Sequence, residues 1–231
     1  MTASDWTYLQ NGLDIATVDR GVTAGVPRPP GGGEFVFAYH SLVVARGAVA
    51  LFVNQSGFAP ADKGCSIRGA LQRGPGGGPL GFSPFLFVGC QGTSVNDTAY
   101  LLGLSDDDPH NLVLRKGAVV AGVPRADAPG TLLASNASYA QGTWLHVRLD
   151  MIVNPNGDVV LAVFENDLVA YPLGSPSVWQ PVPGMDVLID DHLGIQTGSQ
   201  PLTSGRAGFG FAVSDTTRRG YFDHIELLRQ V

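Results

Sequence analysis

The chain has 231 residues and a formal net charge of −6, and charged residues make up only 15% of it. This length suits one large β domain or two small ones. An acidic chain without a basic run argues against nucleic-acid binding as the main task, whereas glycan binding, which uses aromatic rings and hydrogen bonds, stays open. The 31 Gly and 16 Pro residues predict many turns and no long helices.

The first residues, MTASDWTYLQNGLDIATVD, have no basic start and no apolar segment, so we expect no signal peptide. No stretch approaches the roughly 18 apolar residues of a membrane helix, so we expect no membrane partner. The sequence leaves open whether Cys65 and Cys90 form a disulfide. Of 14 basic residues only Lys63 and Lys116 are Lys, an Arg bias typical of a GC-rich coding sequence and a hint of bacterial or bacteriophage origin.

In the N-terminal part, two segments predict strands and two predict loops. A short strand is expected around Leu13–Val18, and the run from Glu34 to Ala50 predicts two strands joined by a turn. The segments Gly21–Gly33 and Gly57–Gly81 are rich in Gly and Pro, and we expect both to be long irregular loops.

The middle of the chain predicts a series of short strands separated by turn residues. These strands are expected at Phe82–Cys90, Ala99–Leu104, Asn111–Lys116, Ala118–Val123 and Thr131–Leu133. The last part predicts a possible short strand at Val187–Asp191 and strands at Gly205–Val213 and Gly220–Arg229.

Between these parts, Gly142–Tyr171 predicts two long strands joined by a tight turn. Apolar residues alternate along each arm, and successive side chains of a strand point to opposite faces. Asn154–Asp158 contains Pro, Asn and Gly, which are the residues of a tight reversal. A lone hairpin is marginal in water, so this one requires further strands and a second sheet. We therefore predict a single all-β domain over residues 1–231, an antiparallel sandwich of two sheets.

The order GTWLHVRLDMIV, VVLAVFEND, GRAGFGFAV and YFDHIELL resembles the concanavalin A-like lectin/glucanase superfamily, in its laminin-G-like and pentraxin-like branches. The match covers about Tyr100–Leu228. The resemblance implies a two-sheet jelly roll and no particular activity, and the sequence adds the long Gly/Pro-rich loops. The resemblance also implies that Trp144 and Phe222 lie in the core between the sheets.

The glycanases of this superfamily are similar to one another in a strand bearing Glu-x-Asp-x-x-Glu, and retaining hydrolysis needs two carboxylates about 5–5.5 Å apart. The stretch Met185–Asp191 has no Glu and the wrong spacing. Asp223 and Glu226 are three residues apart, which places them on opposite faces of a regular strand. We therefore predict that the protein is not an enzyme.

Acidic side chains before a predicted strand are the candidate metal ligands. Asp106, Asp107, Asp108 and Asn111 offer the hard oxygen atoms that Ca²⁺ prefers, without EF-hand spacing. The alternative is a solvated turn, and Asp190–His192 is a weaker second cluster. We expect weak Ca²⁺ binding at most and no other cofactor.

Aromatic side chains next to polar groups are the candidate glycan contacts. They are Trp179 in a Pro-rich segment, Tyr171 and Tyr139, with Tyr100 as a further candidate. The alternative for Trp179 is that it packs its loop onto the sandwich.

Two classes of function remain from the sequence. The first is a non-catalytic structural or interaction protein of an assembly, a capsid decoration or tail component of a bacteriophage virion, located in the virion or host cytoplasm. Its partners would be other virion proteins or further copies of itself, contacted through Arg28, Phe58 and Arg68 in the two long loops; the alternative is that these loops fold back over their own subunit. The second is a soluble glycan-binding lectin-like module, and a glycoside hydrolase is third.

Overall fold

The computed structural model describes residues 6–11, 18–21, 29–32, 36–40, 48–54, 64–73, 82–90, 98–105, 110–118, 130–193, 199–213 and 219–229. These residues form strands and turns and contain no helix. The strands are β1 (Trp6–Asn11), β2 (Val18–Gly21), β3 (Val36–His40), β4 (Ala48–Asn54), β5 (Gly64–Arg73), β6 (Phe82–Cys90), β7 (Thr98–Ser105), β8 (His110–Ala118), β9 (Gly130–Tyr139), β10 (Trp144–Val153), β11 (Val159–Asn166), β12 (Trp179–Pro181), β13 (Leu188–Asp190), β14 (Arg206–Val213) and β15 (Arg219–Arg229).

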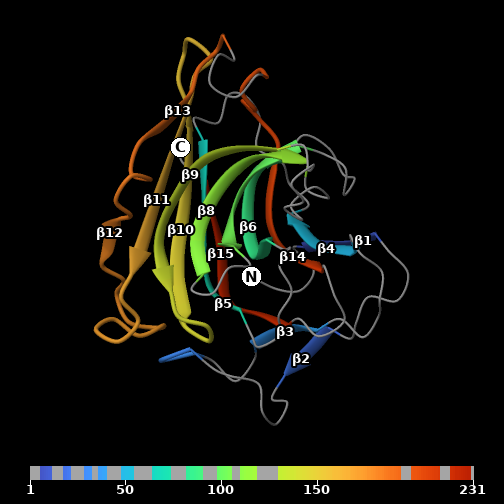
Figure 1. Cartoon of the computed structure of the whole chain (residues 1–231), viewed down its shortest axis with the longest axis vertical. Coiled ribbons are helices and arrows are strands. Elements are labelled where there is room, and N and C mark those ends of the chain that lie inside the picture. Colours follow the sequence, from blue (N-terminus) through green and yellow to red (C-terminus); the bar gives the residue numbers. More distant parts are fainter. Residues whose placement is uncertain are drawn as a thin grey trace.

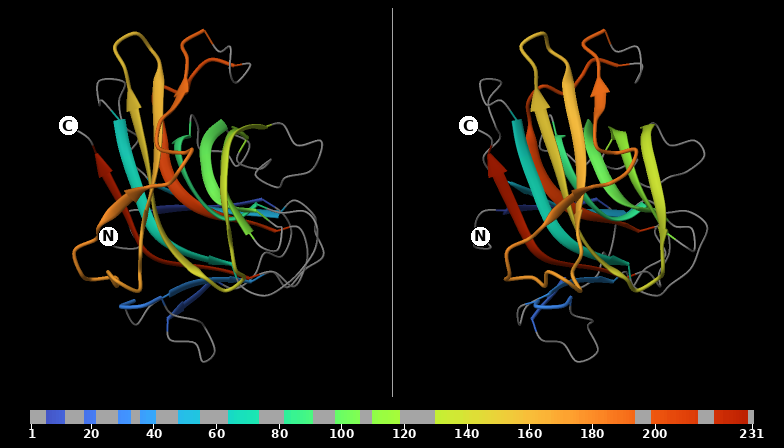
Figure 2. Two further views of the ribbon diagram at one scale, coloured as in Figure 1. Left: turned by 60° about the vertical axis from the view of Figure 1, so that its left-hand side comes forward. Right: turned by 90° about the vertical axis from the view of Figure 1, so that its left-hand side faces the viewer.

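The strands form two antiparallel sheets that face each other as two layers (Figures 1 and 2). The seven-stranded sheet has the order β1-β4-β14-β6-β7-β8-β9. The eight-stranded sheet has the order β12-β11-β10-β5-β15-β3-β2, and β13 pairs with β11. Strand β14 lies between β4 and β6, and β5 lies between β10 and β15, so the sheets interleave distant parts of the chain as a jelly roll does. The predicted two-sheet antiparallel jelly-roll sandwich is confirmed.

The core lies between the two sheets and follows from the alternation along the strands. In β10 the odd-numbered residues from Leu145 to Met151 are buried in it, and the even-numbered residues lie on the outer face of the sheet. The core includes Ile67, Leu71, Leu145, Val147, Leu149, Leu161, Val163 and Phe222 from the eight-stranded sheet, and Leu86, Val88, Tyr100, Leu102, Leu112, Leu114 and Phe209 from the seven-stranded sheet. The rings of Phe209 and Phe222 meet across the core with centroids 5.1 Å apart.

The expectation that Gly57–Gly81 is an irregular loop is wrong for β5. This strand pairs with β10 on one side and β15 on the other, in the middle of the eight-stranded sheet. Ile67 and Leu71 point into the core and are fully buried. Arg68, expected to be a loop contact, therefore lies on a strand. The alternation was obscured because Gly64 and Gly69 interrupt it and a Gly/Pro tract follows it.

The prediction that Phe222 lies in the core is confirmed, and the same prediction for Trp144 is wrong. Trp144 begins β10 on the outer face, where it packs against a small cluster of Ala70, Leu168 and Leu173. The ring of Tyr221 lies beside it, with centroids 6.4 Å apart. The period of two in β10 explains this position, because Leu145 already occupies the inner face.

A buried charged network crosses the sandwich. Lys116 of β8 forms an ion pair with Asp190 of β13 (Nζ to Oδ2, 2.6 Å), and the Tyr100 hydroxyl donates to the same carboxylate at 2.5 Å. The Lys116 ammonium also donates to the backbone carbonyls of Ser199 and Gln200. Tyr100, a candidate glycan contact from the sequence, is therefore an inaccessible core residue.

The described residues leave some predictions untested. Residues 12–17, 22–28, 55–63, 74–81 and 119–129 lie outside them, so most of the two long loops and the strand predicted at Ala118–Val123 cannot be compared. The short strand expected at Val187–Asp191 is present as β13. Among the described residues, no helix is long and apolar enough to cross a membrane.

Candidate functional site

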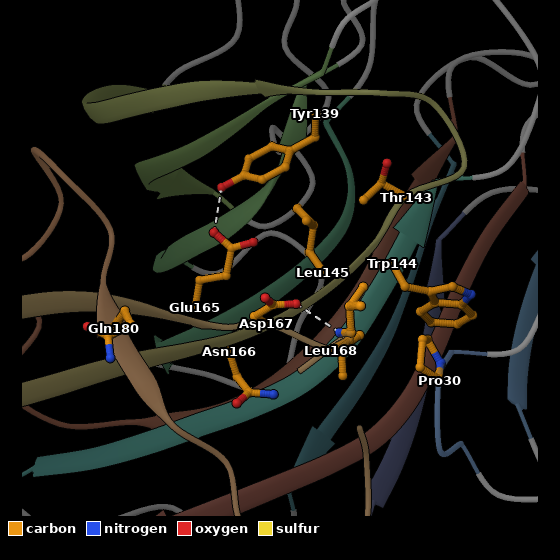
Figure 3. A pocket seen from close by; sticks show the side chains of 11 residues that line it. Pro30, Tyr139, Thr143, Trp144, Leu145, Glu165, Asn166, Asp167, Leu168 and Gln180 are labelled. Carbon is orange, nitrogen blue, oxygen red and sulfur yellow. Dashed lines mark hydrogen bonds between the residues drawn. The ribbon is translucent and has the colours of Figure 1, made fainter. Parts of the chain in front are cut away.

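A cavity of about 610 Å³ opens where β9 and β11 end and β10 begins, at one edge of the sandwich (Figure 3). The turn after β11 and strand β12 complete its wall, together with the short segment 29–32 from the N-terminal part. Its lining residues are Pro30, Tyr139, Thr143, Trp144, Leu145, Glu165, Asn166, Asp167, Leu168, Val169 and Gln180. Aromatic, aliphatic and hydrogen-bonding side chains thus share one concave space, as they do in small-ligand sites.

Tyr139 and Glu165 form the polar centre of this pocket. Tyr139 is the last residue of β9, Glu165 is near the end of β11, and the Tyr139 hydroxyl donates to Glu165 Oε2 at 2.9 Å. Burial raises the pKa of Glu165, and the nearby charge of Asp167 raises it further, against the lowering effect of the bond from Tyr139. Burial and the Glu165 charge together raise the pKa of Tyr139, so this phenol stays protonated and acts as a donor.

The turn after β11 holds one side of the pocket in place. Asp167 Oδ1 accepts hydrogen bonds from the backbone N–H groups of Val169 and Ala170, at 2.8 and 3.3 Å. This turn places Leu168 against Trp144. Farther along, the Leu173 N–H donates to the carbonyl of Pro30 at 2.9 Å, which fixes the segment 29–32 beside the pocket.

The outer face of the eight-stranded sheet next to the pocket carries a second group of side chains. The ring of Trp179 lies over that of His146, with centroids 4.7 Å apart. The guanidinium groups of Arg148 and Arg68 lie 5.3 and 6.0 Å from the Trp179 ring, within range of a cation–π contact. His146 is only 2% exposed, and no hydrogen-bond partner for its Nε2 lies among the described residues.

A β-bulge in β15 corrects one argument made from the sequence. The pairing with β5 shifts between Asp223, opposite Ala70, and Glu226, opposite Arg68. Ala70 and Arg68 are two residues apart on one face, so Asp223 and Glu226 also share the outer face. His224 absorbs the extra residue with a φ of 53°. Glu226 is engaged by Arg68, whose Nε donates to Glu226 Oε2 at 2.9 Å.

The structure separates the predicted contact residues into two places. Tyr139 lies in the pocket, whereas Trp179 and Arg68 lie together on the outer face. Tyr171 is 39% exposed, and its backbone carbonyl accepts a hydrogen bond from Asn166. Arg28 and Phe58 lie outside the described residues.

Sequence reasoning missed Glu165, Asp167 and His146. A signal for the first two existed, because Glu165-Asn166-Asp167 at the end of β11 places carboxylates two residues apart. For His146 no sequence signal distinguishes it from any other outward-facing strand residue.

Of the two predicted groups of metal ligands, the structure describes only the second in full. Asp106, Asp107 and Asp108 lie outside the described residues, so weak Ca²⁺ binding there stays a prediction. In the second cluster, Asp190 faces the buried Lys116 while His192 pairs with Asp158 in the turn after β10. Among the described residues, no three His, Cys, Asp or Glu side chains are grouped to hold a metal ion.

Comparisons with known proteins show the fold. No protein-family model and no curated protein sequence matches the chain. The potassium-bound carbohydrate recognition domain of Emp46p is 14% identical with a TM-score of 0.51, covering 99% of this chain and 90% of that one. Its metal-free form is 13% identical with a TM-score of 0.51, covering 97% and 88%. The PL-14 alginate lyase from Aplysia kurodai is 13% identical with a TM-score of 0.46, covering 84% and 82%. At these identities, the likeness to the Emp46p domain shows a shared concanavalin A-like jelly roll.

Proposed function

We propose that the protein binds carbohydrate without catalysis, as a lectin-like module, through the pocket centred on Tyr139 and Glu165. One observation carries the proposal: the aromatic rings of Tyr139 and Trp144 and the polar side chains of Glu165, Asn166 and Gln180 line one cavity of about 610 Å³. A sugar presents C–H groups that pack on aromatic rings and hydroxyls that need donors and acceptors. The volume falls in the range of about 300–1,000 Å³ found for small-ligand pockets.

The pocket supports binding of a sugar more directly than it supports a reaction on one. The Tyr139 phenol is a poor proton acceptor because its pKa is raised. The Asp167 carboxylate is exposed and holds the backbone of its own turn through Oδ1. Sharing the fold of a carbohydrate recognition domain agrees with this proposal as an analogy.

The test is a glycan array followed by calorimetry on the full chain. Tyr139→Phe removes the hydroxyl bonded to Glu165, and Glu165→Gln removes the charge; each is expected to weaken binding by about tenfold or more. The matched control is Tyr171→Phe, an exposed tyrosine that does not line the pocket, which should bind normally. Unchanged affinity in both pocket variants would place the sugar elsewhere, and release of reducing ends from a bound glycan would show an enzyme.

A second candidate, a structural role in a bacteriophage virion, stays a proposal. The contact residues expected for it are Arg28 and Phe58, which lie outside the described residues, and Arg68, which is paired with Glu226. Association with virion proteins, self-association, and location in a virion or host cytoplasm all belong to this candidate. Mass spectrometry of purified particles and the size of the protein in solution test it independently of glycan binding.

A further inference from the structure

We infer that the pocket selects an amino sugar, whose ammonium group lies between the carboxylates of Glu165 and Asp167. The inference deepens the proposed function and rests on it, because it names the class of carbohydrate for the same pocket. It is carried by the charges and contacts of the lining side chains.

The charged side chains that line the pocket are acidic. Among the eleven described residues that line it, Glu165 and Asp167 are carboxylates, and none is Lys, Arg or His. The nearby guanidinium groups of Arg68 and Arg148 are engaged elsewhere, with Glu226 and Asp150 respectively. A ligand entering this space therefore meets negative charge that no cation among the described lining residues balances.

Glu165 has a position suited to a cationic ligand. Its Oε2 accepts the hydroxyl of Tyr139, and its other oxygen, for which the described residues supply no partner, points toward the middle of the pocket in Figure 3. Burial and the neighbouring charge of Asp167 raise its pKa, which means that the ionised form is disfavoured in the empty pocket. An ammonium group bound there would offset both effects, since opposite charges stabilise each other at short range.

The aromatic walls of the pocket suit a sugar that carries an ammonium group. In Figure 3 Tyr139 lies above the two carboxylates and Trp144 lies to the right of them. Aromatic rings attract cations as well as the C–H faces of sugars. A uronic acid would bring a third carboxylate into the same partly buried space, where like charges repel, so acidic glycans are disfavoured.

The experiment compares three probes that differ in charge: a glucosamine tetramer, its fully N-acetylated counterpart and a uronic acid tetramer. Calorimetry is done with the full chain at about pH 6, between the titration ranges of carboxyl groups and of amines. The glucosamine tetramer is expected to bind about tenfold or more tighter than the acetylated one, the range of one charge-assisted hydrogen bond. Its affinity should also fall with added salt, which screens charge.

Variants then locate the effect. Glu165→Gln and Asp167→Asn should each reduce the ratio of the two affinities. The matched control Asp158→Asn removes a carboxylate in the distant β10–β11 turn and should keep both the affinities and their ratio. Equal affinity for both tetramers, or an unchanged ratio in both pocket variants, overturns the selectivity while leaving sugar binding intact. Binding of none of the probes, together with a blank glycan array, removes the proposed function as well.

Discussion

Acidification from pH 7 to pH 5 is expected to destabilise the fold through His146 by about 2 kcal/mol. This side chain is 2% exposed, lies under Trp179, and faces the charges of His224, Arg68 and Glu226. Burial, with the positive charges of His224 and Arg68, lowers the pKa of His146 to about 4.

The hydrogen bonds of Asn166 determine which neutral tautomer of the His146 ring the fold stabilises. Asn166 Oδ1 accepts the backbone N–H of Val178 at 2.8 Å, so its Nδ2 is the atom that faces His146. This Nδ2 donates to the Tyr171 carbonyl at 2.9 Å and meets His146 Nδ1 at 3.2 Å. Nδ1 must then accept, and the proton of the neutral ring lies on Nε2. Protonating Nδ1 would set two donors against each other.

Proton linkage gives the sign and the size of this loss of folding stability. An unfolded chain protonates a histidine near its ordinary pKa of about 6.5, and the folded chain does so near the lowered value, so the unfolded state binds more protons between them. Stability therefore increases with pH across this window. About 2 kcal/mol is lost by pH 5, and the full loss of about 3 kcal/mol is reached below pH 4.

Urea unfolding at pH 7 and pH 5 measures this loss. His146→Gln keeps an acceptor for Asn166 and removes the titration, so its loss between the two pH values should be smaller by about 2 kcal/mol. His192→Gln is the control, since that ring is exposed in a surface turn and should leave most of the difference. The reasoning is refuted if the wild type and His146→Gln lose the same stability, or if nitrogen NMR finds the proton on Nδ1.

Three further changes test the packing, each by chemical denaturation. Asp190→Asn leaves Lys116 buried without its counter-ion and should cost about 3–5 kcal/mol, well above its neighbour Asp191→Asn; equal losses would contradict the network. Gly205→Ala should cost more than about 1 kcal/mol, because φ is 133° and the new Cβ would lie 2.5 Å from the Cys90 carbonyl oxygen; a neutral result would show that the backbone yields. Phe222→Ala should cost about 3–5 kcal/mol as a core aromatic, and more than Trp144→Ala; the reverse order would place Trp144 in the core after all.

The strands predicted well from the sequence are those in which apolar alternation is unbroken. In β10 and β11 the inward-facing residues are Leu, Val and Met, and the turn between them has Pro, Asn and Gly, so length, face and reversal could all be predicted. Strand β5 has the same alternation, but Gly64 and Gly69 remove side chains from it. Gly69 is small for a reason visible only in the fold, because a Cβ there would lie 2.2 Å from Ile225 Cδ1.

The candidate site was less predictable because it joins distant segments. Pro30, Tyr139, Glu165 and Gln180 come from four parts of the chain and meet only through the sheet order. Tyr139 could be named because exposed tyrosines are common sugar contacts, yet nothing near it in sequence pairs it with Glu165. The bulge at His224 is likewise a tertiary feature, since the spacing of its neighbours alone predicts a regular strand.

The pocket and the outer face are joined by one side chain, and this bears on how a ligand would be recognised. Asn166 lines the pocket, and its amide also ties the Tyr171 carbonyl, the Val178 N–H and the ring of His146. The segment between β11 and β12 is thus held to the sheet at Tyr171 and at Val178 by this single buried residue. Trp179 begins β12 opposite Asn166, so the same anchor sets where its ring covers His146. A sugar chain bound as proposed, with its terminal residue between Glu165 and Asp167, would meet the ring of Trp179 on the adjoining outer face, and Asn166 sets where that ring lies.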